Sequence, residues 1–182
     1  MSTLTGREAT ALLVIDVQNG VVEGAFKRGE VIANIEQAVA KARAANVPVI
    51  WVQHSDEELV IESDAWKIVS DLIPLEGESM VRKTFRSSFE GTNLSEVLAS
   101  LNASHLIICG AQSNNCVRHT GQDALAKGYD VTLISDAHTT TGYEWNGHVV
   151  SAQAVVEEQS DNFNEQLPGR FARAVPLAQL SL

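Results

Sequence analysis

The sequence is poor in cysteine and in basic residues, and each shortage narrows the possible functions. The two cysteines among 182 residues, Cys109 and Cys116, match no zinc ribbon and no CxxC redox pair. In a reducing compartment they do not predict a structural disulfide, so at least one is free for other chemistry. Thirteen Lys and Arg against 23 Asp and Glu give a formal charge of −10. This charge repels nucleic acid and anionic membranes, and we expect neither as a partner.

Long apolar runs are also missing. No run approaches the roughly 20 residues that a membrane-spanning helix needs. The stretch MSTLTGREAT lacks the basic-then-apolar pattern of a secretory signal, so we expect a cytoplasmic protein. A chain of 182 residues with 45% hydrophobic and 20% charged residues is near the globular average. It is long enough for one well-buried core, and we expect a single domain over residues 1–182.

Short β-branched runs alternate with helical patterns along the chain, and no repeat or linker divides them. The expected strands are residues 11–16, 47–53, 80–83, 105–111, 129–135 and 173–177. The expected helices are residues 30–47, 92–103, 115–128 and 148–163. The strands are almost continuously apolar, which means that helices cover both faces of the sheet. The pattern predicts an α/β fold, a three-layer α/β/α domain with a mostly parallel sheet of about six strands.

Ligands of such sheets bind beyond the carboxyl ends of the strands, so the residues found there are the ones to examine. Asp16 follows the first strand, Lys83 ends the third, and Cys116 follows the fourth at the start of a helix. An acid, a lysine and a cysteine are therefore expected to converge on one edge of the sheet.

These three residue types suit acyl transfer from an amide or ester. The first turn of a helix favours a thiolate, which would make Cys116 a nucleophile, although a buried, inert cysteine also fits the position. Asp16 can take a thiol proton, and Lys83 can hold the acid and stabilise developing negative charge. Cys109, inside the strand, is expected to be a buried apolar residue.

Rival chemistries lack their signatures. Phosphotransfer at Asp16 would need a second acid for Mg²⁺, but the residues that follow are VQN. A dinucleotide site needs GxGxxG after the first strand, where only Gly20 and Gly24 occur. The five histidines form no HExxH or DxH pair, so we expect no metal and no cofactor.

Four motifs together resemble the isochorismatase-like cysteine hydrolases, the superfamily of nicotinamidases, N-carbamoylsarcosine amidase, streptothricin hydrolase and isochorismatases. The resemblance runs from about Ala11 to Val175, and its motifs are LLVIDVQNG, KTFRSSFEGT, GAQSNNCVRHT and GYDVTLISDA. It implies a catalytic triad of Asp16, Lys83 and Cys116, in which Asp16 is the general base and acid and Cys116 forms a thioester.

The resemblance further implies a cis peptide between Ala111 and Gln112 and an oxyanion hole formed by the backbone N–H groups of Gln112 and Cys116. It also points to a substrate pocket near the triad, for which we predict the residues Gln18, Phe26, His54, Phe85 and Gln112. Members of the family often form dimers or tetramers, so a homo-oligomer that acts on a small molecule is expected.

Departures from the family pattern narrow the reaction. Metal-dependent nicotinamidases carry D-x-H after the second strand, where this chain reads QHSDEE. Isochorismatases proper, which cleave a vinyl ether, commonly lack the cysteine. The sequence therefore favours hydrolysis of a C–N bond in an amide, carbamoyl compound or lactam. Vinyl-ether hydrolysis and a non-catalytic binding role are the alternatives.

Overall fold

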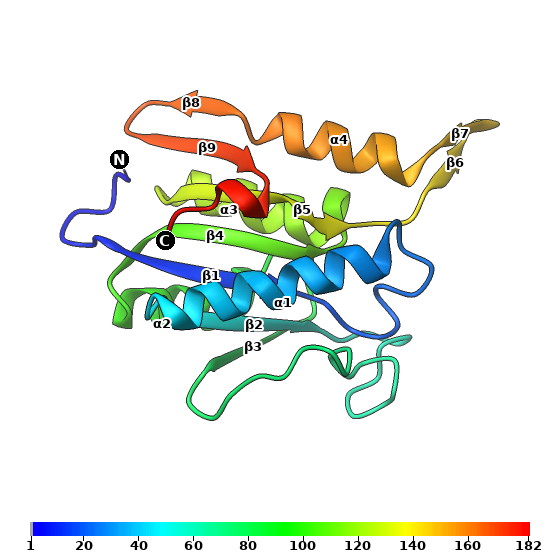
Figure 1. The fold of residues 1–182 in the computed structure, drawn as a ribbon, viewed down its shortest axis with the longest axis horizontal. Coiled ribbons are helices and arrows are strands. Elements are labelled where there is room, and N and C mark those ends of the chain that lie inside the picture. The colour runs from blue at the N-terminus through cyan, green and yellow to red at the C-terminus, as the bar shows by residue number, and fades with distance from the viewer. Residues whose placement is uncertain (1) are drawn as a thin grey trace.

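The fold is built on one twisted sheet of seven strands, seen in a computed structural model that describes residues 2–182 (Figure 1). The strand order is β3-β2-β1-β4-β5-β9-β8, and all neighbours are parallel except the β9–β8 pair at one edge. The strands are β1 (Ala9–Ile15), β2 (Val49–His54), β3 (Ser79–Lys83), β4 (Ala103–Ala111), β5 (Asp130–Thr139), β8 (Glu165–Leu167) and β9 (Arg170–Val175).

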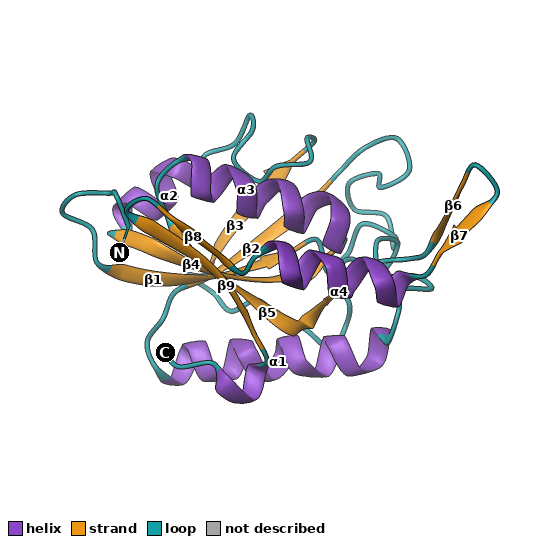
Figure 2. Cartoon of the chain, turned by 90° about the horizontal axis from the view of Figure 1, so that it is seen from above, coloured by secondary structure: helices purple, strands orange, loops and turns teal. Residues whose placement is uncertain are grey.

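Helices lie on both faces of this sheet, which gives three layers (Figure 2). Helix α1 covers one face, and α2 and α3 cover the other; α4 packs against β5 and the segment that precedes α3. The helices are α1 (Arg28–Ala44), α2 (Leu94–Ser100), α3 (Arg118–Ala126) and α4 (Ala152–Asn162). The central strands are buried on both sides, as in β1, where residues 11–15 are at most 1% exposed. The predicted α/β/α fold class with a mostly parallel sheet is confirmed.

One segment differs from its sequence pattern. Residues 148–150, expected to start a helix, form strand β7 (His148–Val150), which pairs with β6 (Tyr143–Trp145) in a hairpin that projects from the body (Figure 1). Asn146 and Gly147 both have positive φ, the conformation that a tight two-residue hairpin turn requires. Helix α4 starts later because the Ser151 hydroxyl caps it by accepting the N–H of Ala154.

Gly110 lets β4 approach β1 next to the carboxyl edge of the sheet. It has φ +120°, and a Cβ atom there would collide with the carbonyl group of Ile15, the residue before Asp16. We predict that Gly110→Ala lowers the free energy of unfolding by about 3 kcal/mol, because buried backbone must shift and the φ value suits only glycine. Urea unfolding measures this. The matched change Gly29→Ala, at a helical glycine with open space around it, should cost nothing. Equal losses at both positions would contradict the close approach.

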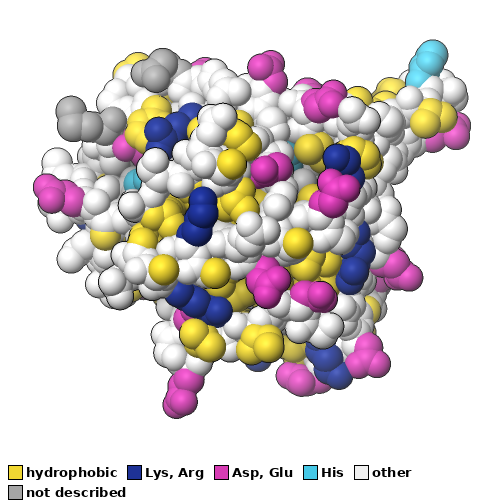
Figure 3. Space-filling view, in the orientation of Figure 1, with side chains coloured by type: hydrophobic (Ala, Val, Ile, Leu, Met, Phe, Trp, Pro, Cys, Tyr) yellow, Lys and Arg dark blue, Asp and Glu magenta, His cyan; other side chains and the backbone are white. Residues whose placement is uncertain are grey.

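Two features of the composition reappear in the structure, namely the many acidic residues and the lack of long apolar runs. On the face that carries α1, acidic side chains are interspersed with basic and hydrophobic ones (Figure 3). None of the helices formed by residues 2–182 is both long and apolar enough to span a membrane.

Candidate active site

A cavity of about 910 Å³ opens at the carboxyl edge of the sheet. Asp16, which follows β1, and Cys116, which follows β4, lie at its base, while the segment after β3 and the loop after β2 form its walls. The volume is in the range of pockets that take small molecules. The edge that the strand order predicts as the ligand site is therefore the edge that carries the cavity.

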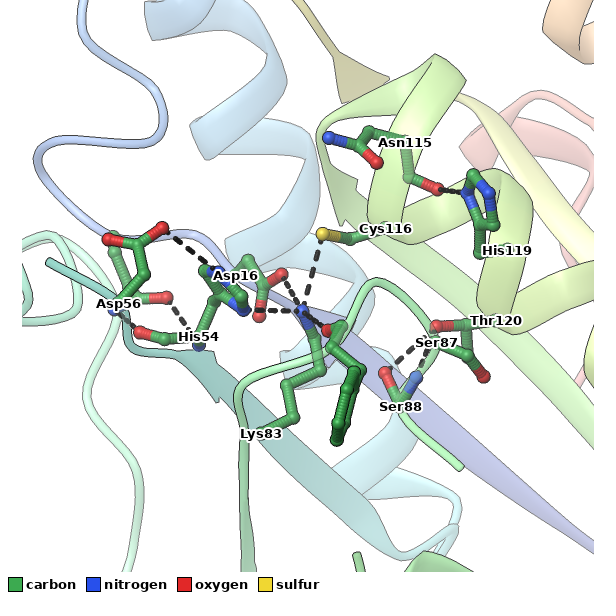
Figure 4. A network of polar contacts seen from close by, with 12 residues as sticks. Asp16, His54, Asp56, Lys83, Ser87, Ser88, Asn115, Cys116, His119 and Thr120 are labelled. Atoms are coloured by element: carbon green, nitrogen blue, oxygen red, sulfur yellow. Dashed lines mark hydrogen bonds and ion pairs between the residues drawn. The ribbon is translucent and has the colours of Figure 1, made fainter. Parts of the chain in front are cut away.

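Lys83 joins the acid to the cysteine (Figure 4). Its Nζ lies 2.6 Å from Oδ2 of Asp16 and 3.2 Å from Sγ of Cys116. The ammonium group also contacts the carbonyl oxygen of Phe85 at 3.2 Å. Asp16 is fully buried and Lys83 is 2% exposed, so this ion pair is shielded from water. The three residues that the sequence predicts to converge are in direct contact.

The surroundings of Asp16 change its pKa, and its backbone conformation is also uncommon. Burial raises the pKa of Asp16, and the ammonium group of Lys83 is the main influence that lowers it. Asp16 also has φ +49°, a left-handed conformation that few residues other than glycine adopt. Such backbone strain gathers at functional sites. A carboxyl group with a raised pKa, beside a thiol, suits a residue that exchanges protons with it.

Burial of Cys116 works against the thiolate that its place at a helix start was expected to favour. Burial, together with the negative charge of Asp16, raises the pKa of Cys116 to about 12, and the charge of Lys83 opposes this only in part. The predicted preference of the helix start for a thiolate is therefore outweighed by desolvation. Burial also raises the pKa of Cys109, whose thiol donates a hydrogen bond to the carbonyl oxygen of Leu13.

The turn that carries Cys116 is a π-helical segment, Ser113–Val117, which runs directly into α3. The predicted cis peptide between Ala111 and Gln112 precedes it and is confirmed. Gln112 lines the cavity beside Cys116, and among residues 2–182 no acceptor receives its backbone N–H. A free N–H next to the sulfur of Cys116 is what the predicted oxyanion hole requires.

Hydrogen bonds join two of the sequence motifs behind the site. Ser88 donates its backbone N–H to the hydroxyl of Thr120 at 2.9 Å, and the two hydroxyl groups are also 2.9 Å apart. The hydroxyl of Ser87 donates to the carboxylate of Asp123 at 2.5 Å. These bonds tie KTFRSSFEGT, which contains Lys83, to the helix that follows Cys116, and Figure 4 shows those between Ser88 and Thr120. The motifs thus fix the lysine relative to the cysteine.

His54 extends the polar network into the cavity wall. Its Nδ1 lies 3.3 Å from Nζ of Lys83, and its Nε2 lies 3.1 Å from Oδ2 of Asp56. The sequence prediction placed His54 at the substrate pocket but missed Asp56, although the spacing of two residues at a strand end was a usable signal. Within residues 2–182, no three His, Cys, Asp or Glu side chains are grouped as metal ligands.

The other predicted pocket residues lie in different places. Phe85 is 49% exposed and lines the cavity. Gln18 is fully buried: its amide group donates to the carbonyl oxygens of His54 and Trp66 and accepts the N–H of His54. It holds the end of β2 and does not line the main cavity. Phe26 lines a separate, smaller cavity between α1 and α4. The structure thus brings Phe85, His54 and Gln112 to the cavity that Asp16 and Cys116 line, and leaves Gln18 and Phe26 away from its surface.

A buried cysteine, carboxylate and lysine at the carboxyl edge of a parallel α/β sheet is the kind of group that cysteine hydrolases use. The family model of the isochorismatase domain matches residues 10–167. The chain therefore belongs to the isochorismatase-like superfamily, whose members are generally hydrolases.

Relatives and solved structures agree with this assignment. A streptothricin hydrolase of Streptomyces noursei is 32% identical over 140 residues, which cover 74% of this chain and 56% of the relative. A "probable inactive nicotinamidase" of Arabidopsis thaliana is 36% identical over 155 residues, 70% of this chain and 79% of the relative. The crystal structure of an isochorismatase from Pseudomonas putida KT2440 superposes with a TM-score of 0.86 at 29% identity, over 94% of this chain and 90% of that one.

Proposed function

We propose that the protein is a cysteine-dependent hydrolase that cleaves a C–N bond of a small amide, carbamoyl compound or lactam. The observation that carries the proposal is the contact of one buried ammonium group, Lys83 Nζ, with both the Asp16 carboxylate and the Cys116 sulfur. This arrangement gives a thiol, an acceptor for its proton and a fixed positive charge beside both. The predicted cytoplasmic location and homo-oligomeric state stay predictions.

In the first half of the reaction, Sγ of Cys116 attacks the carbonyl carbon of the substrate while its proton passes to Asp16. The negative charge that develops on the carbonyl oxygen is taken up by the backbone N–H groups of Gln112 and Cys116. The C–N bond then breaks, Asp16 returns the proton to the leaving nitrogen, and the acyl group remains on sulfur as a thioester. Because the thiol stays neutral until attack, its raised pKa protects it from unproductive reactions.

In the second half, water attacks the thioester carbonyl and gives a proton to Asp16. The tetrahedral intermediate collapses, the C–S bond breaks, and the sulfur regains the proton from Asp16. The acid product leaves the cavity. Lys83 keeps its charge throughout, which stabilises the anionic sulfur each time it forms or departs.

The charges of the cavity wall bear on the substrate. The cavity wall carries one exposed arginine, Arg86, and four exposed acidic residues. The acids are Glu23, Asp56, Glu58 and Glu90. A cleft lined mainly by one sign of charge concentrates ligands of the opposite sign. Neutral and cationic substrates therefore fit this cavity better than anionic ones.

The test is to trap the acyl-enzyme during hydrolysis of matched amides that carry an ammonium group, no charge or a carboxylate. We expect release of amine, and intact-protein mass should show an acyl adduct that peptide mapping assigns to Cys116. Brief treatment with hydroxylamine should remove the adduct, as it does a thioester, and the carboxylate substrate should react most slowly. Turnover of an amide without any adduct on Cys116 would contradict the covalent mechanism.

A further inference from the structure

A second titratable side chain, His138, is buried apart from the catalytic groups. It lies near the carboxyl end of β5, is 1% exposed, and burial lowers its pKa to about 4. Its imidazole is therefore neutral near pH 7, with one ring nitrogen that donates and one that accepts. A buried imidazole needs a partner at each nitrogen.

Both partners of His138 are serine hydroxyl groups. Nδ1 lies 2.8 Å from Oγ of Ser113, and Nε2 lies 3.0 Å from Oγ of Ser160. The hydroxyl of Ser160 donates its proton to the carbonyl oxygen of Val156 within α4, at 3.0 Å. With that proton engaged, Oγ of Ser160 can accept from Nε2–H, and Nδ1 can accept from the hydroxyl of Ser113.

The chain of hydrogen bonds ends on the turn that carries the nucleophile. Ser113 is the first residue of the π-helical segment, three positions before Cys116. The next residue, Asn114, is held from the same strand extension, because the hydroxyl of Thr140 donates to its Oδ1 at 2.9 Å. The end of β5 thus holds the first two residues of the turn by two separate bonds.

We propose that His138 is a positioning residue for Cys116, acting through Ser113 to keep Sγ of Cys116 in contact with Lys83. The charged and titratable groups that face the sulfur are Asp16 from β1, Lys83 from β3 and, behind Lys83, His54 from β2. When the turn loosens, the sulfur leaves this buried group and gains solvent. The catalytic meaning of this role rests on the proposed function, but the position of the thiol can be tested without a substrate.

His105 offers a matched control. Its pKa is also lowered to about 4, mainly by burial, and its ring nitrogens lie 3.3 and 2.8 Å from the hydroxyl groups of Thr10 and Thr132. It stands near the start of β4, at the opposite edge of the sheet from Cys116. Replacing it removes two partly buried hydrogen bonds between an imidazole and hydroxyl groups without touching the turn that carries Cys116.

The experiment measures the rate at which iodoacetamide alkylates Cys116 from pH 7 to pH 10, by peptide mass spectrometry, in the wild type and in Ser113→Ala, His138→Gln and His105→Gln. In the wild type and His105→Gln, the rate should rise about tenfold per pH unit throughout, because only the thiolate reacts. In Ser113→Ala and His138→Gln, the rate should flatten near pH 9 and exceed that of the wild type at pH 8 by about tenfold or more, as the released thiol regains an ordinary pKa.

Profiles of Ser113→Ala and His138→Gln that superimpose on the wild type would overturn the proposal, as would equal flattening in His105→Gln. Ser113→Ala removes a single hydroxyl group, so it decides the matter if His138→Gln fails to fold. Failure of the amidase proposal appears elsewhere, as absence of amide hydrolysis in the wild type, and leaves this comparison valid. Where hydrolysis is found, kcat of Ser113→Ala should fall about tenfold with KM nearly unchanged, because the substrate cavity is intact.

Discussion

Asp16→Asn should reduce hydrolysis by about 10³-fold while making the Cys116 thiol more reactive toward iodoacetamide. The amide side chain has nearly the same shape but takes no proton from sulfur. It also removes the negative charge that raises the pKa of Cys116, while Nζ of Lys83 remains 3.2 Å from the sulfur. The pKa of the thiol therefore falls, and alkylation at pH 8 should accelerate. Steady-state kinetics and peptide-resolved alkylation of the same sample measure the two effects.

Lys83→Met is the control for Asp16→Asn, in which hydrolysis should slow while alkylation of Cys116 accelerates. It removes the cation that favours both the Asp16 carboxylate and the Cys116 thiolate, so it should slow hydrolysis and alkylation together. A slower alkylation of Cys116 in Asp16→Asn would mean that the resting thiolate depends on Asp16. The role of Asp16 as a base that acts only during attack would then be wrong.

Cys116→Ala should lower amide hydrolysis by about 10⁴-fold or more, because no other described group can form the acyl intermediate at this position. The cost in stability should be small, since only one sulfur atom leaves a side chain that is 8% exposed. Thermal unfolding followed by circular dichroism, together with a hydrolysis assay on purified variant, checks both parts.

Cys109→Ala is the matched control for Cys116→Ala. Cys109 is fully buried in β4, and its raised pKa comes from burial alone, without a charged partner. Its replacement should leave hydrolysis unchanged. Activity that survives in Cys116→Ala would instead support the vinyl-ether reaction, in which the cysteine is not required, and loss of activity in Cys109→Ala alone would reverse the assignment of the nucleophile.

Much of the site followed from local patterns, because strand ends in a parallel sheet meet at one edge. Asp16, Lys83 and Cys116 each follow or end an apolar run, and that placement was enough to predict their convergence. Gln18 and Phe26 show where such reasoning fails. Gln18 also follows β1, yet its side-chain amide is hydrogen-bonded to the backbone of His54 and Trp66. Phe26 faces a different cavity because the chain has already turned toward α1.

The pKa of Cys116 shows the same limit for energetics. The position of a cysteine at a helix start predicts a lowered thiol pKa, since the helix dipole favours negative charge within the first turn. The sequence does not reveal how much water reaches the sulfur, nor that the carboxylate of Asp16 lies beside it. Burial and that charge reverse the sign of the shift. Residues 148–150 are a further case, because they continue the apolar period of the following helix but pair with β6 across the Asn146–Gly147 turn.

The sequence alone predicted the central strands and helices, the burial of the sheet on both faces and the convergence of Asp16, Lys83 and Cys116. These depend on patterns within short stretches of chain and on the rule that parallel strands end together. The raised pKa of Cys116, the contacts of Lys83 with Asp16 and Cys116, and the link from His138 to the turn that carries Cys116 became visible in the tertiary structure. Those properties depend on desolvation and on distances between residues far apart in the chain, such as Ser113, His138 and Ser160, which local sequence does not encode.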